Sequence, residues 1–423
     1  MNFDSRLPHS CEKGGNLARI IQLGLLFAAM LFGYSAIADD EFELWKQTFR
    51  QTAEQSGIRP DILDIAFTGL QPHRKVLRLD AHQPEFTRPI WEYLENAASP
   101  ERLDLGQLRL QEHGPLLERI AAHYGVDAHY LVAIWGMESS YGRDTGNYSV
   151  IRSLATLAYA GREERRAFWR EQLLAALRIL QRGDMSMVEL RGSWAGAIGH
   201  TQFIPTTFEA YAVDFDGDGH RNLKDSMADA LASTANYLAK SGWQSGLKWG
   251  EEVRLPDDFD WNLADPAIWK AAERWTLENR ILQYDGDLLS GGAAEGFVLL
   301  PAGYRGPAFM AYQNYTVILK YNNAVSYAMA VGYLAERLRG GPAIAAAWPR
   351  EDTPLSHEQK SELQELLSAV GYSTEGIDGK IGPNTAPHCS WQADIGFPPD
   401  GYVTLEHLQR LRKQSAVRRG SLQ

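Results

Sequence analysis

The stretch Asp127–Gly142, DAHYLVAIWGMESSYG, places one carboxylate, that of Glu138, in an otherwise apolar helical pattern. Its first residue can cap a helix and its last residue can stop one, so a helix is predicted from residue 128 to about residue 140. Leu131, Ile134 and Trp135 precede Glu138 by seven, four and three residues, which places all of them on one helical face. The carboxylate is therefore expected to project from the apolar stripe of the helix.

A carboxylate in this position has two interpretations. Burial disfavours the ionised form and raises the pKa of Glu138 toward neutral pH, where a general acid operates. Alternatively, the side chain sits in a frayed last turn and reaches solvent or a buried arginine. Spacing alone leaves both interpretations open.

The composition excludes some partners. The chain has 423 residues, enough for two or three domains, and a formal net charge of -11. An acidic chain argues against nucleic acid as a partner, because neutralising phosphates needs a basic face. Aromatic residues make up 11% of the chain, which suits both core packing and stacking on sugar rings.

The surroundings of Glu138 contain a series of motifs in a fixed order. They are GMESSYG at 136–142, RGSWAGAIGHTQFIP at 191–205, YAVDFDGDGHRNLKD at 211–225, ANYLAKSGW at 235–243 and YNNAVSYAMAV at 321–331. In these motifs, most of residues 41–338 resembles the lytic murein transglycosylases of the membrane-bound lytic transglycosylase B family, in their soluble or exported forms. The resemblance implies a lysozyme-like, mainly α (α+β) fold with helical and small mixed subdomains. The stretch between residues 245 and 307 is rich in Trp and Gly and is expected to hold the small sheet.

The same resemblance implies a reaction that needs one carboxylate. The family cleaves the β-1,4 bond between N-acetylmuramic acid and N-acetylglucosamine and leaves a 1,6-anhydromuramic end. Glu138 would protonate the glycosidic oxygen and then take the proton of the sugar's own 6-hydroxyl, with no cofactor required. Ordinary glycosidases need two carboxylates, so a hydrolytic muramidase stays an alternative, with Glu209 or Asp214 as the second. A wall-binding scaffold without catalysis is the other alternative.

The resemblance also implies a set of residues that bind the glycan strand. Tyrosines offer an apolar face and a hydroxyl to a sugar, paired arginines suit the lactyl and peptide carboxylates, and Ser and Gln can hold N-acetyl and hydroxyl groups. The expected residues are Tyr93, Arg165, Arg166, Ser193, Gln202, Tyr237, Tyr321, Asn322 and Tyr327. Each type has a structural alternative. The tyrosines can be core residues, and the serine can cap a helix in a Gly-rich turn. The two arginines can lie on a solvated face beside Glu163 and Glu164.

An acidic loop follows the spacing of an EF-hand. Asp214, Asp216 and Asp218 take its first, third and fifth positions, and the seventh would give the carbonyl of His220. Asp225 takes the twelfth position, where an EF-hand has Glu, whereas by resemblance to the family the closing acid is Asp229. We expect weak structural calcium binding, and an acidic turn without metal is the alternative.

The N-terminus has the features of a secretory signal. Basic residues precede a mainly apolar stretch at 20–32, and Ala36 and Ala38 form a cleavage site. The prediction is a signal peptide over 1–38 and export to the periplasm, with a retained anchor as the alternative. No Cys follows the apolar run, so a lipoprotein is not expected.

The remaining chain is expected to have four parts. They are a catalytic domain over 39–340, a linker over 341–354, a small three-helix module over 355–412 and a basic tail over 413–423. The module resembles peptidoglycan-binding domains through LQELLSAVGY, IDGKIGPNTA and DGYVTLEHLQRL, although Pro387 must start or break a helix there. Peptidoglycan strands are the expected partner, other wall enzymes stay open, and a monomer is the default.

Overall fold

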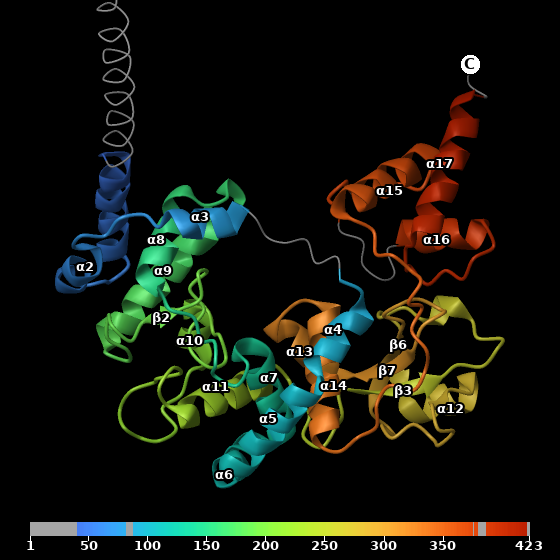
Figure 1. The fold of residues 1–423 in the computed structure, drawn as a ribbon, viewed down its shortest axis with the longest axis horizontal. Helices are drawn as coiled ribbons and strands as arrows, with labels where there is room; N and C mark the ends of the chain where they lie inside the picture. Colours follow the sequence, from blue (N-terminus) through green and yellow to red (C-terminus); the bar gives the residue numbers. More distant parts are fainter. Residues whose placement is uncertain (1–39, 82–87, 375, 380–385, 421–423) are drawn as a thin grey trace, which may run out of the picture.

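The computed structural model describes residues 40–81, 88–374, 376–379 and 386–420. The predicted signal peptide therefore lies outside the described residues. The described chain is mainly helical, as expected, and falls into an N-terminal helical part, a central helical part, a small sheet and a C-terminal group of helices (Figure 1). None of its helices is both long and apolar enough to span a bilayer.

The N-terminal part is a group of helices with its own core. A helix over 40–55 packs with aromatic contacts against α8, as between Phe42 and Tyr159. The other elements are α2 (Pro60–Phe67), α3 (Arg74–Ala81), β1 (Tyr148–Ser149), α8 (Val150–Ala160), η1 (Glu163–Arg165), α9 (Arg166–Arg182), β2 (Arg191–Gly192) and α10 (Pro205–Tyr211). Strands β1 and β2 pair antiparallel.

The central part surrounds the helix that carries Glu138. This helix, α7 (Ala128–Ser139), follows the predicted bounds closely, and Asp127 caps it by accepting from the His129 N–H at 2.9 Å. It is buried on every side from Tyr130 to Gly136, not only along one stripe, because other helices surround it. Helices α5 (Pro100–Glu112), α6 (Gly114–Tyr124), α11 (Met227–Lys240) and α14 (Val325–Leu338) contact α7, and α4 (Ile90–Ala97) and α13 (Gln313–Tyr321) pack on α14.

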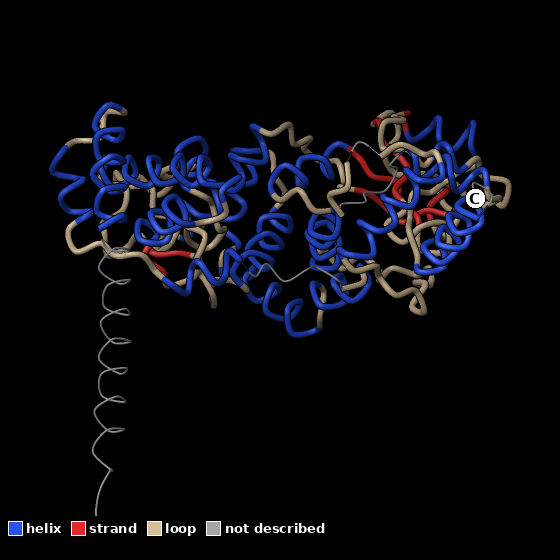
Figure 2. The backbone as a smooth tube through the Cα atoms, turned by 90° about the horizontal axis from the view of Figure 1, so that it is seen from above, coloured by secondary structure: helices blue, strands red, loops and turns tan. Residues whose placement is uncertain are grey.

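The expected sheet has five antiparallel strands in the order β4-β6-β7-β3-β5. Its elements are β3 (Gly250–Arg254), η2 (Trp261–Leu263), β4 (Lys270–Ala271), α12 (Ala272–Asn279), β5 (Leu282–Gln283), β6 (Glu295–Leu299) and β7 (Ala308–Tyr312). One face, with Phe297, Leu299 and Phe309, packs on the central helices, and the other encloses a core around Trp275. Figure 2 shows this sheet and the β1–β2 pair at opposite ends of the molecule.

The C-terminal part has three described helices: α15 (His357–Val370), α16 (Ala386–Asp394) and α17 (Leu405–Gly420). They enclose a core of their own around Trp391, which is fully buried. Pro387 lies in the first described turn of α16, and the helix continues from it to Asp394, so the proline does not break the described helix. Helix α17 continues past residue 412 into the predicted basic tail.

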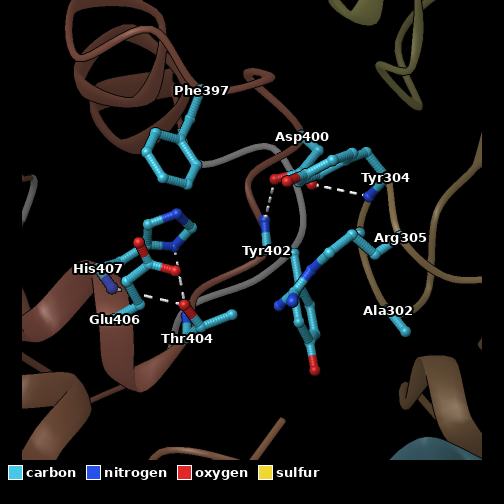
Figure 3. A pocket seen from close by; sticks show the side chains of 10 residues that line it. Ala302, Tyr304, Arg305, Phe397, Asp400, Tyr402, Thr404, Glu406 and His407 are labelled. Carbon is cyan, nitrogen blue, oxygen red and sulfur yellow. Dashed lines mark hydrogen bonds between the residues drawn. The ribbon is translucent and has the colours of Figure 1, made fainter. Parts of the chain in front are cut away.

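This part is docked against the sheet region through Asp400 (Figure 3). The buried Asp400 carboxylate accepts from the backbone N–H of Tyr304 at 2.8 Å, and also from the Tyr402 N–H and the Gln392 amide. A cavity of about 40 Å³ lies beside this contact. The predicted linker is held as well, because the Glu252 carboxylate accepts from the N–H groups of Ala345 and Ala346.

Candidate active site

Glu138 lies in the last turn of α7, close to the start of α14. The Tyr327 hydroxyl donates a hydrogen bond to its Oε1 atom. The side chain is partly buried, whereas the residues before it along the helix, up to Gly136, are fully buried. The carboxylate therefore stands at the edge of the core, with one hydroxyl donor.

The surroundings change the acidity of this carboxylate. Desolvation raises the pKa of Glu138 to about 7, and the hydrogen bond from Tyr327 opposes that shift, because it stabilises the charged form. Such a group holds its proton near neutral pH and can still release it. This is the property that a general acid and base needs.

Four tyrosines converge on the region around Glu138. Burial and the negative charge of Glu138 both raise the pKa values of Tyr93, Tyr321 and Tyr327, which shows that all three lie close to the carboxylate. The rings of Tyr237 and Tyr321 meet edge to face at 5.0 Å, and those of Tyr321 and Tyr327 are parallel at 6.5 Å. The structure thus brings the four predicted tyrosines together.

Two of these tyrosines lie between the cores of the N-terminal and central parts. Tyr237 and Tyr321 pack against both cores. Their hydroxyls are engaged, since Tyr237 donates to the Lys320 carbonyl at 2.6 Å and Tyr321 to the Thr201 carbonyl. Both residues therefore join the two parts beside Glu138, and Tyr327 alone directs its hydroxyl to the acid.

Ser193 and Gln202 belong to a tight loop that follows β2. The Ser193 hydroxyl accepts from the Ala197 N–H at 3.0 Å, so this serine caps a turn in its Gly-rich segment. The Gln202 amide donates to the carbonyls of Gly199 at 2.7 Å and Thr145 at 3.2 Å. Gln202 also has a left-handed backbone, with φ of 51°. These hydrogen bonds fix the conformation of the loop in the absence of a ligand.

Arg165, Arg166 and Asn322 are less closely tied to the acid. The Arg165 guanidinium lies 4.5 Å from the centre of the Trp169 ring, and Arg166 donates to the Gly161 carbonyl at 2.8 Å. Asn322 is exposed at the end of α13. Among the described residues, none of the three forms a hydrogen bond, ion pair or ring contact with Glu138.

Glu209 and Asp214, the two candidates for a second catalytic carboxylate, interact with other groups. Glu209 forms ion pairs with Arg178 at 2.7 Å and Arg182 at 2.6 Å. Asp214 accepts from three backbone N–H groups of its own loop. Within the described chain, burial and Tyr327 account for the shifted pKa of Glu138, and no second carboxylate contributes to it.

The sequence did not predict that His200, two residues before Gln202, contacts α7. The Ser139 hydroxyl donates to the His200 carbonyl at 2.6 Å, and the Trp135 indole N–H donates to the His200 Nδ1 atom at 3.1 Å. All three residues lie within quoted motifs, but their pairing joins positions more than 60 residues apart. No periodicity within one element could have indicated it.

The acidic loop gathers three of its predicted ligands. Carboxylate oxygens of Asp214, Asp216 and Asp229 lie within 4.8 Å of one another, which suits the oxygen shell that Ca²⁺ prefers. Asp229 is buried and accepts from the N–H groups of Phe215 and Asn222, and burial raises its pKa. A cation there would offset the repulsion from Asp216.

Asp218 and Asp225 are not among these three carboxylates. Asp218 accepts from the N–H of His220, and Asp225 accepts from the Asn222 amide. The imidazole of His220 points to the Gly183 carbonyl at 2.8 Å. The geometry therefore favours Asp229 over Asp225 as the closing acid.

Known proteins are similar to this chain in sequence and in fold. Residues 41–336 match the family described as "Transglycosylase SLT domain". The chain is 30% identical over 250 residues to the membrane-bound lytic murein transglycosylase B of Escherichia coli K12; the match covers 58% of this chain and 66% of that protein.

Solved structures are similar over more of the chain. The crystal structure of SltB3 from Pseudomonas aeruginosa in complex with NAG-anhNAM-pentapeptide has 52% identity and a TM-score of 0.85, over 88% of this chain and 99% of that one. The Escherichia coli lytic transglycosylase Slt35 in complex with calcium has 26% identity and a TM-score of 0.60, over 70% and 92%. The chain thus belongs to the lytic transglycosylases of the membrane-bound lytic transglycosylase B family, a family of enzymes that act on peptidoglycan.

Proposed function

We propose that the protein cleaves the β-1,4 bond between N-acetylmuramic acid and N-acetylglucosamine with Glu138 as its single acid and base. One observation supports this most: Glu138 is desolvated enough to have a pKa of about 7 and accepts a hydrogen bond from Tyr327. Both candidates for a second carboxylate are held by other partners. A single carboxylate suits an internal nucleophile better than an activated water.

The proposed reaction has two proton transfers. Glu138 gives its proton to the glycosidic oxygen, the bond from that oxygen to the anomeric carbon breaks, and N-acetylglucosamine leaves as an alcohol. The 6-hydroxyl oxygen of the muramic residue then bonds to the anomeric carbon and loses its proton to the Glu138 carboxylate. The acid is regenerated, and no water is consumed.

The residues around Glu138 have separate roles in this proposal. Tyr327 fixes the carboxylate, and Tyr93, Tyr237 and Tyr321 offer ring faces to the sugars. Ser193, Gln202 and Asn322 would hold N-acetyl and hydroxyl groups, and Arg165 and Arg166 the carboxylates of the substrate. The pentapeptide-bearing fragments bound by SltB3 support a substrate of this class.

We propose further roles for the regions outside the acid. Asp214, Asp216 and Asp229 would bind a structural Ca²⁺, with Asp218 and the His220 carbonyl around it, and the calcium complex of Slt35 supports this assignment. Residues 355–412 would bind peptidoglycan, as their resemblance suggests. Export to the periplasm after cleavage at residue 38 stays a prediction from the sequence.

The test is mass spectrometry of the fragments released from purified peptidoglycan. The proposal expects 1,6-anhydromuramic ends, lighter by one water than hydrolysis products, and no such fragments from Glu138→Gln. Reducing muramic ends would instead show hydrolysis. Folded wild-type protein that binds peptidoglycan but releases no fragments would indicate a scaffold.

A further inference from the structure

The turn that follows Glu138 has an unusual backbone. Ser140, Tyr141 and Gly142 all have left-handed φ values, of 49°, 59° and 84°. Residues other than glycine rarely adopt this backbone conformation, because their Cβ atom crowds the following carbonyl. Gln202, in the segment that carries His200, has the same conformation, so the backbone is strained in two segments.

The His200 side chain packs against the first of these segments. Its Nδ1 atom accepts from the Trp135 indole at 3.1 Å, with the two rings edge to face. A Cβ atom on Gly142 would lie 2.5 Å from the His200 ring, so the ring leaves room only for glycine there. Burial lowers the pKa of His200, which keeps the imidazole neutral and able to accept this bond.

The His200 backbone completes the connection. Its carbonyl accepts from the Ser139 hydroxyl at 2.6 Å, and the same hydroxyl accepts from the Gly142 N–H at 3.0 Å. Trp135 and Ser139 lie three residues before and one residue after Glu138 on α7. His200 therefore contacts the helix on both sides of the acid.

The other side of His200 is fixed to the acidic loop. Its N–H donates to the Leu223 carbonyl at 2.9 Å. A Cβ atom on the preceding Gly199 would lie 2.1 Å from that same carbonyl oxygen, so the two backbones are in close contact. The segment that ends in Gln202 thus cannot shift independently of the acidic loop.

We propose that His200 is a positioning residue for the reaction, which holds the left-handed turn after Glu138 closed and so keeps the carboxylate desolvated. This inference rests on the proposed role of Glu138 as the acid. The ring links α7 to the segment that carries Gln202, and the His200 backbone N–H links that segment to Leu223 in the acidic loop. Without the ring, the turn at 140–142 can relax and water can reach the carboxylate.

The kinetic test compares His200→Ala with His200→Asn on a soluble peptidoglycan oligomer. Alanine removes the acceptor for the Trp135 indole, and kcat should fall about 100-fold, as expected for a misplaced acid, while KM stays within about twofold. Asparagine places an oxygen near the former Nδ1 position, so the kcat of His200→Asn should be at least about tenfold higher than that of His200→Ala. The exposed His123→Ala should match wild type.

The pH profile separates positioning from a loss of stability. The reaction needs protonated Glu138, so activity declines above its pKa. Water at the carboxylate lowers that pKa, and the alkaline limb of His200→Ala should move to lower pH. A merely structural role would reduce the folded fraction and leave the profile of the folded enzyme unchanged. Trp135→Phe should move the limb in the same direction, and its effect should not add to that of His200→Ala.

A second measurement does not depend on activity. Amide hydrogen exchange at residues 136–144 should be faster in His200→Ala than in wild type, and near wild type in His200→Asn. Unchanged exchange, or a pH profile that matches wild type, would overturn the positioning role. If the wild type released no fragments, the proposed function would fail while the exchange result would still decide whether His200 holds the turn.

Discussion

The end of α7 and the junction between the sheet and the C-terminal helices both remove a carboxylate from water, but they treat it differently. Asp400 accepts from three donors: two backbone N–H groups and the amide of Gln392. Among the residues that the structure describes, Glu138 accepts from Tyr327 alone. Burial raises the pKa of both residues, and it raises that of Glu138 to about 7.

The difference separates a structural carboxylate from a reactive one. Three fixed donors stabilise the charge of Asp400 and join two parts of the chain. A single hydroxyl leaves Glu138 with unused acceptor positions and a proton that it can transfer.

Glu138→Gln should have the largest effect. The amide cannot donate and recover a proton as the acid does, so the release of fragments should fall by about 10³-fold or more. Glu336→Gln is the matched control, because Glu336 on α14 also accepts from a tyrosine hydroxyl, that of Tyr130 at 3.1 Å. Its activity should stay near wild type. Equal losses of activity in both variants would show that Glu138 is not the specific acid of the reaction.

The same substitution should stabilise the fold at high pH. The pKa of Glu138 is about 7 in the folded state and near its usual 4.5 when unfolded, so the folded state binds more protons between these values. Stability is therefore lost as pH rises through this window, by up to about 3 kcal/mol. Urea unfolding should show that Glu138→Gln gains more at pH 8 than at pH 4. A gain independent of pH would contradict the raised pKa.

Asp400→Ala should loosen the C-terminal helices. The variant leaves three donors without their acceptor, at a cost of roughly 1 kcal/mol each. Limited proteolysis should then cut residues 341–354 faster than in wild type, while cleavage of short soluble glycans stays unchanged. Glu406→Gln changes an exposed carboxylate beside the same cavity and should leave proteolysis as it is. Slow cutting of Asp400→Ala would show that other contacts hold the junction.

Tyr327→Phe should shift the pH profile in the direction opposite to His200→Ala. The Tyr327 hydroxyl lowers the pKa of Glu138, so its loss raises that pKa by about one unit. The alkaline limb of activity should move to higher pH. The control is Tyr315→Phe, since the buried Tyr315 hydroxyl has no partner among the described residues. An unmoved limb in Tyr327→Phe would show that this hydrogen bond does not tune the acid.

Calcium should give the smallest effect. Millimolar Ca²⁺ should raise the Tm of the wild type by a few degrees, because a ligand that binds only the folded state stabilises it. Asp229→Asn should abolish the rise, and Asp225→Asn should retain it. The reverse pattern would show that Asp225 closes the loop.

The sequence predicted the local features well. The 128–140 helix, its Asp127 cap and the small sheet follow from residue order and are present. The single carboxylate on an apolar helix was also visible, although its catalytic interpretation needed the resemblance to a family. The sequence left Asp225 and Asp229 open as the closing acid of the loop, and the fold favours Asp229 because it lies with Asp214 and Asp216.

Contacts between distant segments could not be predicted in this way. The hydrogen bond from Tyr327 to Glu138 joins residues 189 positions apart, and the bond from Tyr304 to Asp400 joins residues 96 apart. Such pairs depend on how elements pack, which no periodicity within one element encodes. For the same reason the sequence predicted only a linker over 341–354, and not that Glu252 of the sheet accepts hydrogen bonds from its backbone.

The most direct test of the central claim is a titration of the Glu138 side chain. Carbon-13 NMR of the glutamate carboxyl carbons, compared between wild type and Glu138→Gln, would isolate the signal of this residue. Because desolvation dominates at Glu138, the midpoint should lie near pH 7. A midpoint at or below the ordinary value of 4.5 would show a solvated or ion-paired carboxylate and would contradict its role as the single acid and base.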